Sequence, residues 1–217
     1  MSNLSGPRWG PASKGAPRQL VVLCHGVGTD GNDLIGLAPV WARGLPDAVF
    51  VAPYAPEPFD MAPMGRQWFS LGDLDPGKLE AGVRRAAWAL DGFIDEQLAR
   101  CALPPTAYAL MGFSQGAMTA LFTGLRRAAA PRAILAFSGA LIAPEALRAE
   151  MKNHAPVLLA HGEADAVVPA FRSREAEAAL LAVNIPVETV FPAGLGHGID
   201  DAILEAGALF LQNAFAL

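Results

Sequence analysis

The pentapeptide GFSQG, at residues 112–116, places Ser114 between two glycines. An apolar run (AYALM, residues 107–111) precedes it and a helical pattern follows it, so the serine is expected at a tight strand-to-helix turn. Such a turn leaves no room for side chains two residues before and after the serine, and glycine at both positions relieves the crowding. The first N–H groups of the following helix favour a negative charge that develops beside them. The pattern therefore predicts that Ser114 is a nucleophile.

A serine hydroxyl needs a base, and four histidines are available. His197 lies in the glycine-rich GLGHG, just after the last predicted strand, and open parallel sheets place their sites at the carboxyl ends of strands. His25 and His161 each close a strand as His-Gly and are expected to fix a turn through backbone hydrogen bonds. His154 lies in a polar stretch typical of the surface. We therefore expect His197 to be the base.

A third residue should hold the imidazole in its reactive tautomer and stabilise the imidazolium. Asp165, in HGEADAVVP, follows the fifth predicted strand within a few residues. Glu163 is the alternative carboxylate, but it lies closer to the end of that strand. Asp200 and Asp201 fall in the first turn of the last predicted helix, where they are expected to act as caps. The pattern favours Asp165.

The resulting chain order of serine, aspartate and histidine is that of the α/β-hydrolases, and each residue follows a different predicted strand. Acyl transfer also needs two N–H donors for the oxyanion of the tetrahedral intermediate. One is expected from Gln115, the residue after the nucleophile. The other is expected from Val27, in the HGVG turn that follows an early apolar strand.

Short apolar runs alternate with longer helical patterns along the chain. Most of the runs are apolar throughout, as expected for strands that are covered on both faces. Strands are predicted at residues 20–24, 49–52, 107–111, 133–137, 157–160 and 187–191. Helices are predicted at residues 78–100, 115–127, 171–183 and 199–214. The alternation predicts an α/β fold with a mostly parallel central sheet and helices on both faces.

The length of 217 residues suits one domain, so a single α/β-hydrolase domain is predicted over residues 1–217. Residues 1–18 are rich in proline and glycine and are expected to form an extension or an edge strand. Residues 53–77 form a long insertion with large apolar side chains, which is typical of a functional loop. We expect this insertion to form part of a pocket.

Composition excludes several classes of protein. Lysine and arginine number 16 against 21 aspartate and glutamate, a formal net charge of −5, so a nucleic-acid surface is not expected. Cys24 and Cys101 lack the spacing of a disulfide framework or a metal site. The first residues lack the apolar core of a secretory signal, and prolines and polar residues interrupt the uncharged stretch near residues 101–125. We expect a cytoplasmic monomer or homodimer without a membrane span.

Six blocks resemble the phospholipase/carboxylesterase family, which includes the acyl-protein thioesterases. They are LVVLCHGVGTDGNDLIGLAP, RQWFSLGD, ALMGFSQGAM, FSGAL, HGEADAVVP and GLGHGID. The resemblance extends from about residue 20 to the end of the chain. It implies an α/β-hydrolase without a large lid domain that hydrolyses carboxylic esters, lysophospholipids or protein thioesters and needs no cofactor.

The resemblance also implies roles for individual residues. The catalytic positions of the family fall on Ser114, Asp165 and His197, and its oxyanion positions fall on Val27 and Gln115. Both sets agree with the assignment made from the residues themselves.

The acyl pocket implied by the resemblance would use Trp68, Phe69, Leu141 and Val168. Each of these residues has an alternative role. Trp68 and Phe69 could anchor the long insertion onto the core, and Leu141 and Val168 could be core packing. The stretch 53–67 matches the family less well than the other blocks, which leaves the length of the substrate open.

The sequence therefore predicts a serine carboxylesterase that cleaves esters of short to medium acyl chains through an acyl-enzyme on Ser114. An acyl-thioesterase or a lysophospholipase would use the same site. A dienelactone-type hydrolase would more naturally carry cysteine at residue 114. A non-catalytic ligand-binding α/β-hydrolase is a further alternative, against which the complete set of catalytic residues argues.

Overall fold

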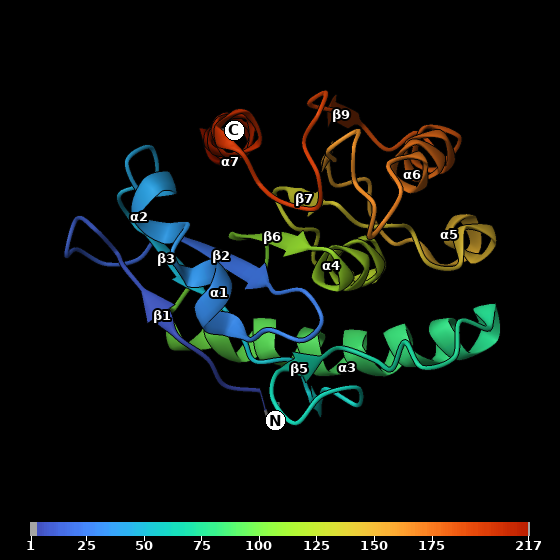
Figure 1. Ribbon diagram of the computed structural model, residues 1–217. Helices are drawn as coiled ribbons and strands as arrows, with labels where there is room; N and C mark the ends of the chain where they lie inside the picture. The colour runs from blue at the N-terminus through green and yellow to red at the C-terminus, as the bar shows by residue number, and fades with distance from the viewer. Residues whose placement is uncertain (1–3, 217) are drawn as a thin grey trace.

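A computed structural model describes residues 4–216. Within them, seven strands form one sheet in the order β1-β3-β2-β6-β7-β8-β9 (Figure 1). Neighbouring strands pair in parallel, except that β1 is antiparallel to β3 at the edge of the sheet. The strands are β1 (Arg8–Trp9), β2 (Gln19–Cys24), β3 (Ala48–Val51), β6 (Tyr108–Phe113), β7 (Ile134–Phe137), β8 (Val157–Ala160) and β9 (Val187–Val190).

Helices cover both faces of this sheet, and each face has its own apolar core. Alternate residues of β2 face the two cores because successive side chains of a strand point to opposite sides. One core is covered by α3 (Pro76–Arg100), α4 (Gln115–Arg126), α5 (Pro144–Glu150) and α6 (Phe171–Leu181). The other is covered by α1 (Gly31–Ile35), α2 (Ala38–Trp41) and α7 (Asp201–Ala216). This double cover explains why most of the strands are apolar throughout.

The predicted sheet and its four long helices are confirmed, with ends that differ by a few residues. The short helices α1, α2 and α5 were not predicted, because four to seven residues carry too little periodicity to reveal a helix. The insertion at 53–77 also contains an unpredicted hairpin, β4 (Glu57–Pro58) paired with β5 (Arg66–Gln67). The last strand, β9, is half-buried rather than fully buried because it lies at an edge of the sheet.

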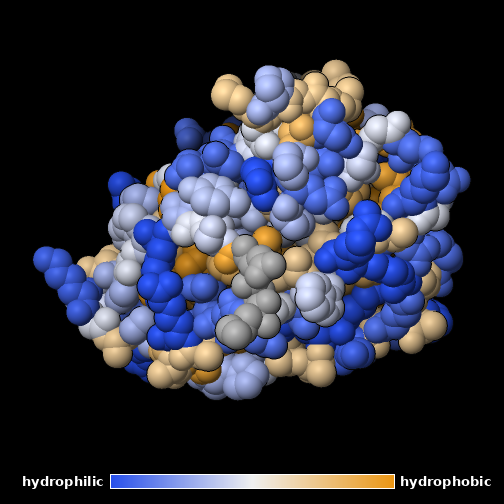
Figure 2. All heavy atoms as spheres, turned by 90° about the horizontal axis from the view of Figure 1, so that it is seen from below, coloured by the Kyte–Doolittle hydropathy of each residue, from blue (hydrophilic) through white to orange (hydrophobic). Residues whose placement is uncertain are grey.

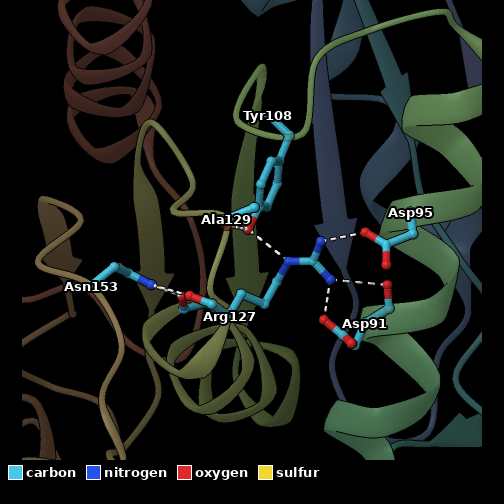
Figure 3. A network of polar contacts seen from close by, with 7 residues as sticks. Asp91, Asp95, Tyr108, Arg127, Ala129 and Asn153 are labelled. Atoms are coloured by element: carbon cyan, nitrogen blue, oxygen red, sulfur yellow. Dashed lines mark hydrogen bonds and ion pairs between the residues drawn. The ribbon is translucent and has the colours of Figure 1, made fainter.

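A buried arginine ties α3 to the far end of α4 (Figure 3). Arg127 follows α4, and its side chain is only 6% exposed. Its Nε donates to the Tyr108 hydroxyl at 2.9 Å, Nη2 donates to Asp95 at 2.5 Å, and Nη1 donates to the Asp91 carboxylate. The Tyr108 hydroxyl in turn donates to the Ala129 carbonyl at 2.8 Å. The network lies at the opposite end of α4 from Ser114.

We expect Arg127→Met to lower the free energy of unfolding by about 1–3 kcal/mol, because it removes the buried partner of a hydroxyl and two carboxylates. The loss should stay below that of a fully buried ion pair, since the side chains of Asp91 and Asp95 are 48% and 64% exposed and water can solvate them. Urea unfolding measures the change. The control Arg172→Met breaks an exposed pair with Glu175 and should cost less than about 0.5 kcal/mol. Equal losses in the two variants would contradict this account.

Candidate active site

Ser114 occupies a strained turn between β6 and α4. Its φ of 55° and ψ of −120° lie in a region that residues other than glycine rarely adopt. Both glycines of the motif are required, because neither position has space for a side chain. A Cβ at Gly112 would overlap the Gly116 carbonyl, and a Cβ at Gly116 would overlap the Cys24 carbonyl at the end of β2. The turn therefore presses the start of α4 against β2 and presents the serine at the carboxyl edge of the sheet.

Asp165 and His197 are joined directly. His197 Nδ1 donates to Asp165 Oδ2 at 2.6 Å, and Asp165 Oδ1 accepts from the N–H groups of Val167 and Val168 at 2.8 and 2.9 Å. Burial alone would raise the pKa of Asp165, but the hydrogen bonds from His197, Val168 and Val167 outweigh it and lower the pKa. Because an ionised carboxylate only accepts, His197 Nδ1 carries a proton, and in the neutral imidazole Nε2 then carries the lone pair.

The loops after β8 and β9 meet closely enough to allow this contact. The Ala164 N–H donates to the Leu195 carbonyl at 2.9 Å, and the Glu163 N–H donates to the Pro192 carbonyl at 3.1 Å. A Cβ at Gly162 would overlap the Leu195 carbonyl. Glycine at this position therefore permits the two loops to approach each other.

His197 also lies beside the serine turn. Its ring centroid is 4.8 Å from that of Phe113, the residue before Ser114. A Cβ on Gly26 would be 3.5 Å from the Ser114 Cβ, so the turn after β2 borders the serine as well. The structure thus brings the loops after β2, β6, β8 and β9 together at one edge of the sheet (Figure 1).

The other carboxylates have different partners. Glu163 is exposed and forms an ion pair with Arg174 at 2.6 Å. Asp200 Oδ1 accepts from the Ile203 N–H at 2.9 Å and caps α7, as the sequence pattern predicts.

The remaining histidines contact backbone carbonyls. His161 is fully buried, with Nε2 at 2.7 Å from the Val168 carbonyl and 3.2 Å from Asp165 Oδ2, and its Nδ1 is 2.7 Å from the Ser173 hydroxyl. His154 is exposed, and its Nδ1 lies 3.3 Å from the Asn184 carbonyl.

His25 holds the turn that carries Val27. Its Nε2 accepts from the Ala55 N–H at 3.0 Å, so Nδ1 carries the proton and donates to the Gly26 carbonyl at 2.7 Å. The Thr29 hydroxyl donates to the same carbonyl at 3.0 Å. The Gly26 carbonyl and the Val27 N–H belong to one planar trans peptide and point in opposite directions. The Val27 N–H is therefore directed away from the His25 ring.

Trp68 and Phe69 have no exposed surface. The Trp68 indole N–H donates to the His25 carbonyl at 2.9 Å. The side chain of Gln115 accepts from the Trp68 backbone N–H at 2.8 Å and donates to the Phe69 carbonyl at 2.6 Å. Phe69 also packs against Gly82 of α3. This burial favours the second role that the sequence allows, an anchor for the insertion.

Leu141 and Val168 are both partly exposed, after β7 and β8 respectively. Leu141 also packs against the edge of a core cluster.

A groove of about 1070 Å³ runs between α3 and the insertion, and residues such as Glu57, Arg66, Arg84 and Trp88 line it. None of Ser114, Asp165 and His197 is among the described residues that line this groove. Figure 2 shows the α3 face, on which hydrophilic side chains predominate. The groove is therefore not identified as the active site, because the residues expected to react do not line it.

Solved structures share this fold. The crystal structure of esterase PE8 matches with a TM-score of 0.92 and 43% sequence identity, and the match covers 97% of this chain and 99% of that chain. Arabidopsis thaliana SOBER1 has the same fold, with a TM-score of 0.81 at 22% identity over 91% of this chain and 99% of that chain. The protein is an α/β-hydrolase, and its described residues contain no large lid domain.

Sequence comparison defines the family. The model of the phospholipase/carboxylesterase family matches residues 11–214, so the chain belongs to this family. Esterase YpfH of Escherichia coli is 28% identical, over 87% of this chain and 79% of that protein. Acyl-protein thioesterase 1 of Gibberella zeae is 25% identical, over 89% of each chain.

Within residues 4–216, no helix has both the length and the apolar character to cross a membrane. The same residues contain no group of three or more His, Cys, Asp and Glu side chains that could hold a metal ion.

The state of His25 predicts a pH dependence of stability. Burial lowers its pKa, so below about pH 6.5 the unfolded chain binds a proton more readily than the folded one. Stability rises with pH wherever the unfolded state binds more protons, so the free energy of unfolding should fall as the pH is lowered from 7 to 5. His25→Asn should reduce this slope, as measured by urea unfolding at each pH. The exposed control His154→Asn should leave it unchanged, and an equal slope in the wild type and His25→Asn would refute the prediction.

Proposed function

We propose that this protein is a serine hydrolase that cleaves carboxylic esters through an acyl-enzyme on Ser114, with His197 as base and Asp165 as its orienting carboxylate. The observation that carries the proposal is the 2.6 Å hydrogen bond from His197 Nδ1 to the buried Asp165. The His197 ring also packs against Phe113, beside the strained turn that holds Ser114. An imidazole held in this tautomer presents a lone pair on Nε2, which is what a general base requires.

The reaction has two halves. In the first, His197 Nε2 takes the proton of the Ser114 hydroxyl as Oγ attacks the substrate carbonyl carbon, and the leaving alcohol then receives that proton as the C–O bond breaks. In the second, His197 takes a proton from water, the hydroxide attacks the acyl-enzyme, and Ser114 regains its proton as the acid leaves. In both halves the ionised Asp165 stabilises the imidazolium.

The oxyanion of each tetrahedral intermediate would bind the N–H groups of Val27 and Gln115. Gln115 is the first residue of α4, so its N–H has no partner within the helix. Among residues 4–216, no protein group accepts a hydrogen bond from the Val27 N–H. Two free donors beside the nucleophile support this assignment.

The natural ester is proposed to carry a short to medium acyl chain. Without a large lid, the site is open to water-soluble esters, and no interfacial activation is expected. Leu141 and Val168 would contact the acyl chain. The names of the relatives include both an esterase and a thioesterase, and the family is described as phospholipase/carboxylesterase, so acyl-thioester or lysophospholipid hydrolysis at the same site is the second candidate. A panel of p-nitrophenyl esters and acyl-thioesters compared by kcat/KM decides between them.

Ser114→Ala should abolish covalent labelling by a fluorophosphonate probe and lower kcat by roughly 10⁴-fold or more, because the acyl-enzyme no longer forms. Mass spectrometry of the labelled peptide locates the adduct. Labelling that persists in the variant would show that the nucleophile is another residue. A wild-type protein that neither labels nor hydrolyses any ester would point to the non-catalytic alternative.

Asp165→Asn should keep the fold and slow turnover by about 10⁴-fold, because the imidazole loses its orienting acceptor. Glu163→Gln is the matched control, since it changes a carboxylate two residues away that pairs with Arg174 at the surface. Its kcat should remain at the wild-type level. If Glu163→Gln gives the large loss, the orienting carboxylate has been assigned to the wrong residue.

Chain-length preference tests the acyl contacts. Each buried CH₂ contributes about 0.8 kcal/mol, or roughly fourfold in kcat/KM. Leu141→Ala should therefore lower kcat/KM for hexanoate and octanoate esters more than for acetate esters. Leu181→Ala removes an exposed leucine of α6 and should leave the profile unchanged. An unaltered profile in Leu141→Ala would mean that the acyl chain binds elsewhere.

A further inference from the structure

We infer that Trp68 is a positioning residue of the oxyanion hole, within a brace formed by residues 66–69 that holds both backbone donors in place. The inference rests on the proposed function, because it assigns a role to residues that surround the Val27 and Gln115 N–H groups. This role suits a buried tryptophan better than the acyl-pocket role that the family resemblance implies for Trp68.

The brace binds the turn after β2 at three points. The Gly28 N–H donates to the Arg66 carbonyl at 2.8 Å, and the Arg66 N–H donates to the Thr29 carbonyl at 2.9 Å. The Trp68 indole N–H donates to the His25 carbonyl at 2.9 Å. The turn that carries one oxyanion donor is therefore hydrogen-bonded to the brace on both sides of that donor.

These contacts fix the direction of the Val27 N–H. Trp68 holds the His25 carbonyl, and the His25 ring and the Thr29 hydroxyl hold the next carbonyl, that of Gly26. Two successive peptide planes are thereby set, and the Val27 N–H belongs to the second of them. If the His25 carbonyl lost its indole partner, the first plane would gain freedom to rotate, and the second plane would lose the support of its neighbour.

The same tryptophan holds the residue that carries the other donor. Its backbone N–H binds Gln115 Oε1 at 2.8 Å, while Gln115 Nε2 binds the Phe69 carbonyl at 2.6 Å. The Gln115 side chain is only 1% exposed, so these are its partners instead of water. The two N–H groups of Trp68 thus reach the two sides of the oxyanion hole, and no other described residue makes both contacts.

An oxyanion hole is sensitive to this kind of positioning, because its donors must be aimed at the place where charge develops in the transition state. Removing one donor outright typically lowers kcat by about 10²–10³-fold. Loosening a donor without removing it should therefore lower kcat by a smaller factor and leave the binding of the ground-state ester almost unchanged.

The test compares two tryptophans. Trp68→Phe keeps an aromatic ring but removes the indole N–H together with part of the ring volume, and it should lower kcat by about 10- to 100-fold with KM within about twofold. Trp41→Phe is the matched control: Trp41 is also buried, and its indole N–H donates to the Leu204 carbonyl at 3.0 Å on the opposite face of the sheet. It should lose similar stability in urea unfolding and retain kcat within about twofold.

A second variant and a second readout keep the test decisive. Gln115→Met keeps the length of the side chain and removes both of its hydrogen bonds, so it should lower kcat without changing KM in the same way. Inhibition by a trifluoromethyl ketone, whose adduct with the serine carries an oxyanion, should weaken in proportion to kcat/KM in both variants. If Trp68→Phe fails to fold, Gln115→Met decides the question.

The outcomes separate this inference from the proposed function. Wild-type protein that fails to react with a fluorophosphonate and to hydrolyse esters would overturn the proposed function and the inference with it. Wild-type activity with an unchanged kcat in Trp68→Phe, or an equal loss in Trp41→Phe, would overturn the inference alone. A selective loss in Trp68→Phe, matched by weaker ketone inhibition, supports it.

Discussion

The close approach of α4 to the end of β2 is the contact on which the rest of this site depends. Only a hydrogen atom fits at residue 116, because a larger group would overlap the Cys24 carbonyl. This approach brings the serine turn beside the turn after β2, and it forces Ser114 into a backbone region that costs about 1–3 kcal/mol. The strain persists because β6 is paired on both sides and α4 is buried along most of its length, so the surrounding structure holds the turn.

Charge at the site is distributed so that one carboxylate stays ionised although it is buried. Asp165 has no exposed side-chain surface, yet it accepts hydrogen bonds from one imidazole and two backbone N–H groups. A second buried ring, that of His161, lies 3.2 Å away and is itself held by the Val168 carbonyl. Hydrogen-bond donors of the protein therefore replace water around the charge, and the field at His197 is set before any substrate binds.

Sequence patterns predict mainly those parts of the structure that depend on residues close together in the chain. Apolar runs and glycine spacing predict the sheet and the serine turn, and chain order predicts that Asp165 and His197 meet. The burial of Trp68 could not be predicted, because the composition of a loop does not tell whether a ring faces solvent or the core. The side-chain role of Gln115 was missed for a related reason: its partners lie 46 and 47 residues away. The half-exposed β9 did carry a signal, the polar Glu188 and Thr189 in its centre.

The insertion at residues 53–77 has one part that is hydrogen-bonded to the site and one part that is exposed to solvent. Residues 66–69 make the hydrogen bonds to the site, whereas residues 61–64 are all exposed, with Met61 and Met64 at 71% and 80%. Changes at residues 61–64 should therefore leave in place the hydrogen bonds that residues 66–69 make to the candidate site. An exposed loop of this kind tolerates changes of length and sequence better than the buried residues that follow it.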